Sequence, residues 1–324
     1  MKTQKTVPIT AIFGIIVIGL IISSPMTIIP SVNAQSKSTP LSDVIPSHAK
    51  ATLDQIREQV NLHSGWVGMM SWDGNSVSID YLGPMESNPY KNTSHDLRLD
   101  PSPQVNDADA IKKDTTASGT AIFKEVGTVT ALKSSDTTVN LFNVLNAMSS
   151  DNNRWIQVGL FYNNYLGTVT NAWHLDYNSI ETSNGANTFS PVVSPALTMS
   201  TGDTVKLFIN ADTTFGGQYT MGENDITNNH GASYTFSLSG DTGHTINLGE
   251  VVVSGSYYPS GPQMEEHASG TNIYKWNTQA FTFDFYDTST SSSTTSVTGW
   301  NGQEGSSGTV STTNSPASAT FTYN

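Results

Sequence analysis

Two polar residues stand in apolar stretches of the sequence, where a strand would bury them. Gln157 lies in WIQVGLFY (155–162), and Glu250 lies in NLGEVVVSG (247–255). A buried glutamine or glutamate needs hydrogen-bond partners or a ligand. If both face one cleft, the glutamate can act as general base towards water and return the proton to a leaving amine. The glutamine amide can donate to the oxyanion of the tetrahedral intermediate, so the two residues would form a minimal peptide hydrolase.

Other catalytic and metal-binding chemistries find less support in the sequence. There are no cysteines, so disulfides and thiolate chemistry are excluded. The seven histidines form no zinc-binding pair, and no stretch matches an EF-hand loop, so we predict no metal and no cofactor. The G-x-S-x-G motif of serine hydrolases is absent. ENDITN (223–228) has Asn228 where the E-x-D-x-x-E motif of glucanases needs a second glutamate, and its turn-forming residues predict a loop.

Four short motifs carry a resemblance to a known family. They are WIQVGLF (155–161), NAWHLDYN (171–178), MSTGDTVKLFIN (199–210) and INLGEVVVSG (246–255). In this order, over about residues 118–286, they resemble the scytalidoglutamic peptidases, or eqolisins. The resemblance implies a concanavalin A-like sandwich of curved antiparallel strands with acid endopeptidase activity. Carried to this sequence, it implies that Gln157 and Glu250 are catalytic residues on the concave face and that Trp173 forms a wall of the cleft.

The chain departs from the family pattern beside both polar residues. Val251 follows the glutamate where the family has tryptophan, and Leu175 and Asp176 replace a glutamate and an aromatic residue. The alternative prediction is therefore a non-catalytic cell-surface sandwich that binds carbohydrate or protein. Under either prediction the substrate-binding residues are Trp155, Trp173 and Tyr177, because aromatic rings stack on ligands.

The N-terminal sequence predicts export. Lys2 and Lys5 precede an apolar stretch, Val-Asn-Ala at 32–34 forms a cleavage signal, and no second apolar span follows. We expect cleavage there and a secreted or cell-surface protein, with an uncleaved membrane anchor as the alternative. Without residues 1–34, 12 basic residues remain against 27 acidic ones, so the net charge changes from −13 to −15. This sign argues against nucleic acid, so a polypeptide substrate or a cell-surface glycan is the expected partner of a monomeric chain.

A helix and a hairpin are expected before the main set of strands. Ser47 predicts a helix N-cap, and a helix through about Leu62 would have an apolar face formed by Leu53, Ile56 and Val60. WVGMMSWDGNSVSIDYLGP (66–84) predicts a hairpin, since Asp73-Gly74 is a tight-turn signal. Residues 85–114 contain three prolines and no sustained periodicity, which predicts a long surface loop.

From Ser118 onward, short β-type stretches alternate with turn residues. They lie at 120–132, 138–145, 155–162, 172–180, 203–211, 217–223, 232–239, 249–256, 280–287, 295–300, 308–313 and 319–324. This spacing predicts a mainly β fold, an antiparallel jelly-roll sandwich. The predicted organisation is a signal peptide at 1–34, an N-terminal linker, helix and hairpin at 35–117, and a sandwich domain at 118–324. A pro-segment removed on activation is an alternative role for residues 35–117.

Overall fold

The structure is a computed structural model. It describes residues 41, 44–90, 105–112, 118–126, 139–149, 151–163, 173–181, 186–193, 203–238, 240–247, 251–253, 256–258, 261–268, 279–287, 292–294, 300–303, 308–314 and 317–323. Side chains are described at 41, 44–90, 144–149, 151–160, 173, 175, 177, 203–238, 240–246, 261 and 311–313. All of these belong to one compact unit, residues 38–324, and the predicted signal segment lies outside the described residues.

The helix and the hairpin form as the sequence predicts. α1 (Lys50–Leu62) buries the three predicted apolar residues, and β1 (Trp66–Asp73) pairs with β2 (Ser76–Pro84) before a short 3-10 turn, η2 (Met85–Ser87). Gly74 in the hairpin turn has a φ of 56°, a left-handed conformation that glycine adopts without steric cost. The predicted cap is wrong, because Ala49 and not Ser47 holds the N-cap position and no side chain caps the helix.

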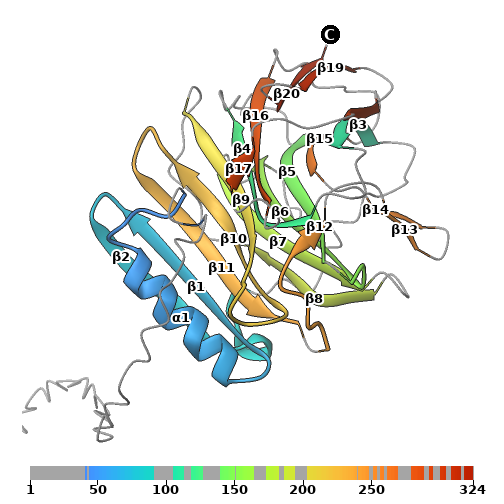
Figure 1. Cartoon of the computed structure of the whole chain (residues 1–324). Helices are drawn as coiled ribbons and strands as arrows, with labels where there is room; N and C mark the ends of the chain where they lie inside the picture. Colours follow the sequence, from blue (N-terminus) through green and yellow to red (C-terminus); the bar gives the residue numbers. More distant parts are fainter. Residues whose placement is uncertain are drawn as a thin grey trace, which may run out of the picture. The chain divides into compact units, whose positions relative to one another are not determined.

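Two antiparallel sheets contain most of the remaining strands (Figure 1). In the first, which we call the helix-covered sheet, successive pairings join β2, β1, β11 (His230–Ser237), β10 (Gln218–Asp225), β9 (Val205–Ala211), β4 (Ser118–Val126) and β16 (Gln279–Asp287). Beyond β16 lie β17 (Ser292–Thr294), β20 (Ala317–Tyr323) and β19 (Gly308–Asn314).

The second sheet contains Gln157, and we call it the Gln157 sheet. Its order is β8 (Ala186–Val193), β7 (Trp173–Glu181), β6 (Arg154–Asn163), β5 (Val139–Ser149), β15 (Gly261–Ala268), β3 (Val105–Lys112) and β18 (Trp300–Gln303). The short β12 (Ile246–Asn247) pairs with both β4 and β5 and so connects the two sheets. A separate two-stranded sheet consists of β13 (Val251–Val253) and β14 (Ser256–Tyr258).

The prediction of a mainly β, antiparallel fold with an N-terminal helix and hairpin is confirmed, and some elements differ. β3 lies within residues 85–114, for which a loop was expected, and β8 and β15 were not predicted. The hairpin belongs to the main structure, because β1 pairs with β11 from Val67↔Phe236 to Asp73↔His230. The domain boundary expected at residue 117 stays a prediction.

The middle of the helix-covered sheet is buried on both of its faces. On one face, α1 and the preceding residues pack in a cluster that includes Ile56, Trp72 and Phe208. On the other face, the rings of Tyr234 on β11 and Tyr177 on β7 stack with their centroids 4.7 Å apart, which brings the two sheets together. Polar side chains on these central strands therefore have no route to water on either side.

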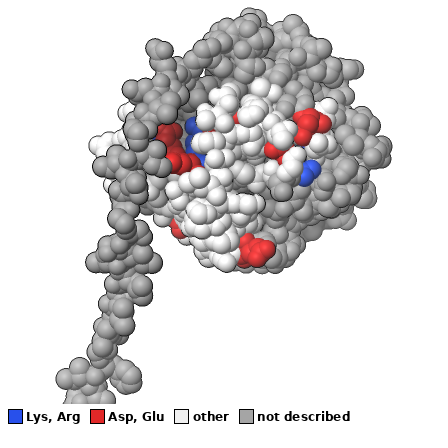
Figure 2. Space-filling model, turned by 60° about the horizontal axis from the view of Figure 1, so that its bottom comes forward, with Lys and Arg blue, Asp and Glu red and all other residues white. Residues whose placement is uncertain are grey.

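On the face shown in Figure 2, most of the described surface is uncharged, and the few basic side chains lie close to acidic ones. Among the described residues, no helix is both long enough and apolar enough to span a membrane.

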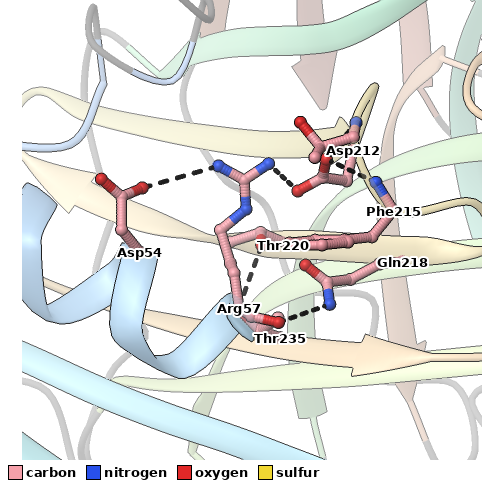
Figure 3. Close-up of polar contacts among 8 residues, drawn as sticks. Asp54, Arg57, Asp212, Phe215, Gln218, Thr220 and Thr235 are labelled. Atoms are coloured by element: carbon pink, nitrogen blue, oxygen red, sulfur yellow. Dashed lines mark hydrogen bonds and ion pairs between the residues drawn. The ribbon is translucent and has the colours of Figure 1, made fainter. Parts of the chain in front are cut away.

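A buried ion pair attaches α1 to the loop that follows β9 (Figure 3). Nη2 of Arg57, which is 8% exposed, donates to Oδ2 of Asp212, which is 3% exposed. The buried Gln218 amide donates to the Arg57 carbonyl at 2.9 Å, so the helix has two polar attachments to the sheet. Asp54 lies 3.8 Å from the other end of the same guanidinium but is 57% exposed, so its contribution to stability is small.

We expect Arg57→Met to lower the free energy of unfolding by about 3 kcal/mol, because it leaves the Asp212 carboxylate buried without its cation. The matched control is Asp54→Asn, which removes the exposed partner of Arg57 and should change the free energy by less than about 0.5 kcal/mol. Urea unfolding of the three proteins measures both values. Equal effects of the two substitutions would show that the buried pair does not hold the helix.

Candidate functional site

Gln157 lies near the centre of the Gln157 sheet. The apolar stretch around it forms β6, which pairs with β5 on one side and β7 on the other. Gln157 is 2% exposed, and its neighbours Ile156 and Val158 are fully buried. The side chain of Gln157 is therefore almost completely covered by other residues of the chain.

The amide of Gln157 has a defined orientation. The Gly261 carbonyl can only accept a hydrogen bond, so the nearby Asn146 side chain presents its Nδ2 to it, at 3.3 Å. The Asn146 oxygen then faces Gln157, whose Nε2 donates to it at 2.9 Å. The Gly261 carbonyl thus determines the orientation of the Asn146 amide, and the Asn146 oxygen determines which end of the Gln157 amide is the NH2 group. One N–H of that group is donated to Asn146.

Neither Asn146 nor Gly261 was predicted from the sequence. Asn146 and Gln157 are directly opposite each other in the β5–β6 ladder, and Asn146 is also opposite Gly261 in the β5–β15 ladder. Gly261 has a φ of 133°, in a region that residues with a Cβ rarely adopt. In the sequence, the glycine at the start of β15 is the signal that could have indicated this contact. Only the strand register shows that the Gly261 carbonyl lies beside the Asn146 side chain.

Glu250 lies outside the described residues, and its pairing with Gln157 stays a prediction. The described residues on either side of it are Asn247, the last of β12, and Val251, the first of β13. Asn247 is opposite Met148 on β5, two positions from Asn146. β12 thus ends opposite Met148, and β15 begins opposite Asn146.

Of the three predicted aromatic residues, Trp155 lies on the same face of the sheet as Gln157, and Trp173 and Tyr177 lie on the opposite face. Val158 is opposite Tyr177 and Gln157 is opposite Asn178, so Tyr177 lies on the other face of the sheet from Gln157. Trp173, four residues from Tyr177, shares its face, whereas Trp155 shares the face of Gln157. Trp155 is 2%, Trp173 3% and Tyr177 0% exposed. Their burial makes them part of the core and does not favour the substrate-binding role predicted for them.

Only the second half of ENDITN, residues 226–228, forms the turn predicted from its residues. Its first three residues end β10, and Glu223 is fully buried on the face that is turned towards the Gln157 sheet. Neither carboxyl oxygen of Glu223 has a hydrogen-bond partner among the described residues. Burial, and next the negative charge of Asp225, raise the pKa of Glu223 well above the ordinary value of 4.5. The backbone N–H groups of Ala232 and Asp225 lower the pKa of Glu223, but by less than burial and Asp225 raise it. Neither N–H group makes a hydrogen bond of ordinary geometry to Glu223.

Asp225, the carboxylate nearest Glu223 in the sequence, is held in a turn. The Asn228 side chain donates to Asp225 at 2.9 Å and to Asp203 at 2.8 Å, and His230 Nδ1 lies 3.6 Å from Asp225. This arrangement closes the β10–β11 hairpin and uses the oxygens that a cation would need. Within the described part of the chain, no group of three or more His, Cys, Asp or Glu residues has the geometry of a metal site.

We expect the buried Glu223 carboxyl to make the fold more stable in acid than at neutral pH. A raised pKa means that the folded state holds this proton more tightly than the unfolded chain does. The contribution of the Glu223 carboxyl to the free energy of unfolding is therefore complete below about pH 4.5 and is lost as the pH rises. Glu223→Gln keeps the shape without the titration, so the melting temperature of the variant should fall less than that of the wild type between about pH 4 and pH 8. Parallel curves for the two proteins would contradict this assignment.

Comparison with known proteins yields similarity to solved structures only. No family model matches the chain, and no curated protein matches it. A crystal structure of scytalido-glutamic peptidase with a peptide-based transition state analog has a TM-score of 0.37 and 12% identity, covering 68% of this chain and 98% of that one. Aspergilloglutamic peptidase from Aspergillus niger has a TM-score of 0.34 and 16% identity, covering 58% and 99% respectively. At these values the similarity does not assign a function.

Proposed function

We propose that this chain is a glutamic-type endopeptidase that hydrolyses peptide bonds in acid. Glu250 is the general base towards water and then the acid towards the leaving amine, and Gln157 stabilises the oxyanion. The observation that supports this assignment is the fixed orientation of the Gln157 amide, with its NH2 group as donor. The predicted export signal at 1–34 places the activity outside the cytoplasm.

A preoriented amide suits the oxyanion role. Negative charge on the carbonyl oxygen develops only as water attacks, and a donor already held in place stabilises it without reorganisation. Asn146 accepts one N–H of Gln157. The second N–H is the group that we assign to the oxyanion.

Chain connectivity supports the choice of Glu250 as the partner. Asn247 is hydrogen-bonded beside β5 at Met148. Glu250 follows Asn247 by three residues in the sequence, and we assign it as the base from this position and from its side-chain type. A glutamate base must be ionised, so activity should appear as the pH rises through about 4.

The alternative of a non-catalytic sandwich that binds a glycan or a protein finds less support. Stacking on a sugar ring needs an exposed aromatic face. Six aromatic residues of the sequence suit that role. Trp155, Trp173 and Tyr177 are 3% exposed or less, and the side chains of Tyr257, Tyr258 and Trp276 lie outside the described ones.

We expect cleavage of an unstructured polypeptide by the full chain between about pH 3 and 6, measured by mass spectrometry across pH 2 to 7. Gln157→Ala should lower kcat about 100- to 1000-fold, the usual cost of removing an oxyanion donor. Glu250→Ala should abolish turnover, because no other group takes the proton from water.

The matched controls are Gln55→Ala and Glu58→Ala, which remove the same residue types from the exposed side of α1. Both should leave kcat unchanged. Folding of every variant is checked by circular dichroism, since Gln157 is buried. Cleavage that survives both site substitutions, or no cleavage by the folded wild type, would overturn the proposal.

A further inference from the structure

We infer that Asn146 is a positioning residue, which holds the Gln157 amide with its NH2 group as the donor. The inference rests on the proposed function for its effect on catalysis, but the orientation itself is measurable in the protein without substrate. Asn146 does not touch the reacting atoms, and its effect on catalysis passes through Gln157.

The chemistry of Asn146 matches this role at both ends of its side chain. It is fully buried, donates Nδ2–H to the Gly261 carbonyl, and accepts Nε2–H from Gln157 at its Oδ1. A serine hydroxyl is too short to span both partners, and an aliphatic side chain offers neither group. An asparagine is therefore the smallest side chain that supplies a donor to one strand and an acceptor to the other.

The consequence of losing this contact follows from the symmetry of an amide. The two ends of the Gln157 amide have nearly the same shape, so without Asn146 the group can turn by about 180°. The carbonyl oxygen would then occupy the position of the donor and would repel the developing oxyanion. Because the oxyanion exists only in the transition state, the loss should lower kcat and leave KM nearly unchanged.

The first test uses two substitutions of Asn146 in the full chain. Asn146→Leu removes both hydrogen bonds, and we expect kcat to fall about 10- to 100-fold at every pH, with KM within about twofold of the wild type. Asn146→Asp behaves differently because the introduced carboxyl titrates. When protonated, it donates to the Gly261 carbonyl and accepts from Gln157, as asparagine does. When ionised, it only accepts, and it faces the carbonyl of Gly261 with like polarity.

Compared with the wild type at the same pH, Asn146→Asp should therefore keep most of its kcat at about pH 4 and lose it as the pH rises towards 6. Burial favours the protonated form of the introduced carboxyl. If Asn146 served only the stability of the strand pair, kcat of Asn146→Asp would not fall in this way as the pH rises. The pH profile thus separates positioning from general support.

The matched control is Thr235→Val. Thr220 and Thr235 also form a buried cross-strand pair, at 3.0 Å, but on β10 and β11 of the helix-covered sheet. This substitution should destabilise the fold comparably and leave both kcat and its pH profile unchanged.

The second measurement is the NMR signal of the Gln157 side-chain NH2 group, assigned by comparison with Gln157→Glu. In the wild type, the proton that is bonded to Asn146 should exchange with solvent more slowly than an unbonded amide proton does. In Asn146→Leu this protection should be lost, and in Thr235→Val it should be kept.

The outcomes separate this inference from the proposed function. An active wild type with a normal kcat in Asn146→Leu would overturn the inference alone. If the wild type cleaves no peptide, the proposed function fails, and the amide signals then decide the orientation. Signals that are the same in the wild type and in Asn146→Leu would overturn the inference in either case.

Discussion

The structure depends on one constraint: its central strands are buried on both faces, so polar side chains there must find partners inside the protein. The helix-covered sheet has α1 on one side and the Gln157 sheet on the other. Thr220 meets Thr235 across two strands, Arg57 meets Asp212, and Gln157 meets Asn146. Each contact satisfies a buried group and also fixes its orientation. In a chain without cysteines, such contacts and apolar packing maintain the geometry of the site.

Glu223 and Ser233 depart from this constraint, because their side-chain oxygens have no hydrogen-bond partner among the described residues, and the departure of Glu223 fits the proposed acid environment. The Glu223 carboxyl group lies next to Asp225 in a fully buried position. Burying such a group is least costly when it is protonated and uncharged. The buried Glu223 carboxyl therefore makes the fold more stable in acid, the range of pH in which a glutamate with an ordinary pKa begins to ionise.

The sequence predicts the elements that local patterns specify. The spacing of Leu53, Ile56 and Val60 predicts α1, and Asp73-Gly74 predicts the hairpin, because both signals lie within a few residues. The role of Asn146 is not predictable in this way, since its carbonyl partner Gly261 is 115 residues away and only the strand register brings them together. Glu223 was assigned to a loop because its neighbours form turns, and its burial arises from packing against the second sheet. The sequence indicates Gln157 as a candidate because it is a polar residue in an apolar strand. It does not predict the orientation of the Gln157 amide, which depends on Asn146 and Gly261.

The central claim is that the oriented Gln157 amide and the Glu250 carboxylate serve one reaction centre. The most direct measurement is an experimental structure of the full chain in acid, in which the positions of both side chains are seen. We predict that the Gln157 nitrogen and a Glu250 oxygen lie within about 3 Å of the same water molecule or of the atoms that replace it. Side chains directed to opposite faces of the Gln157 sheet would contradict the claim.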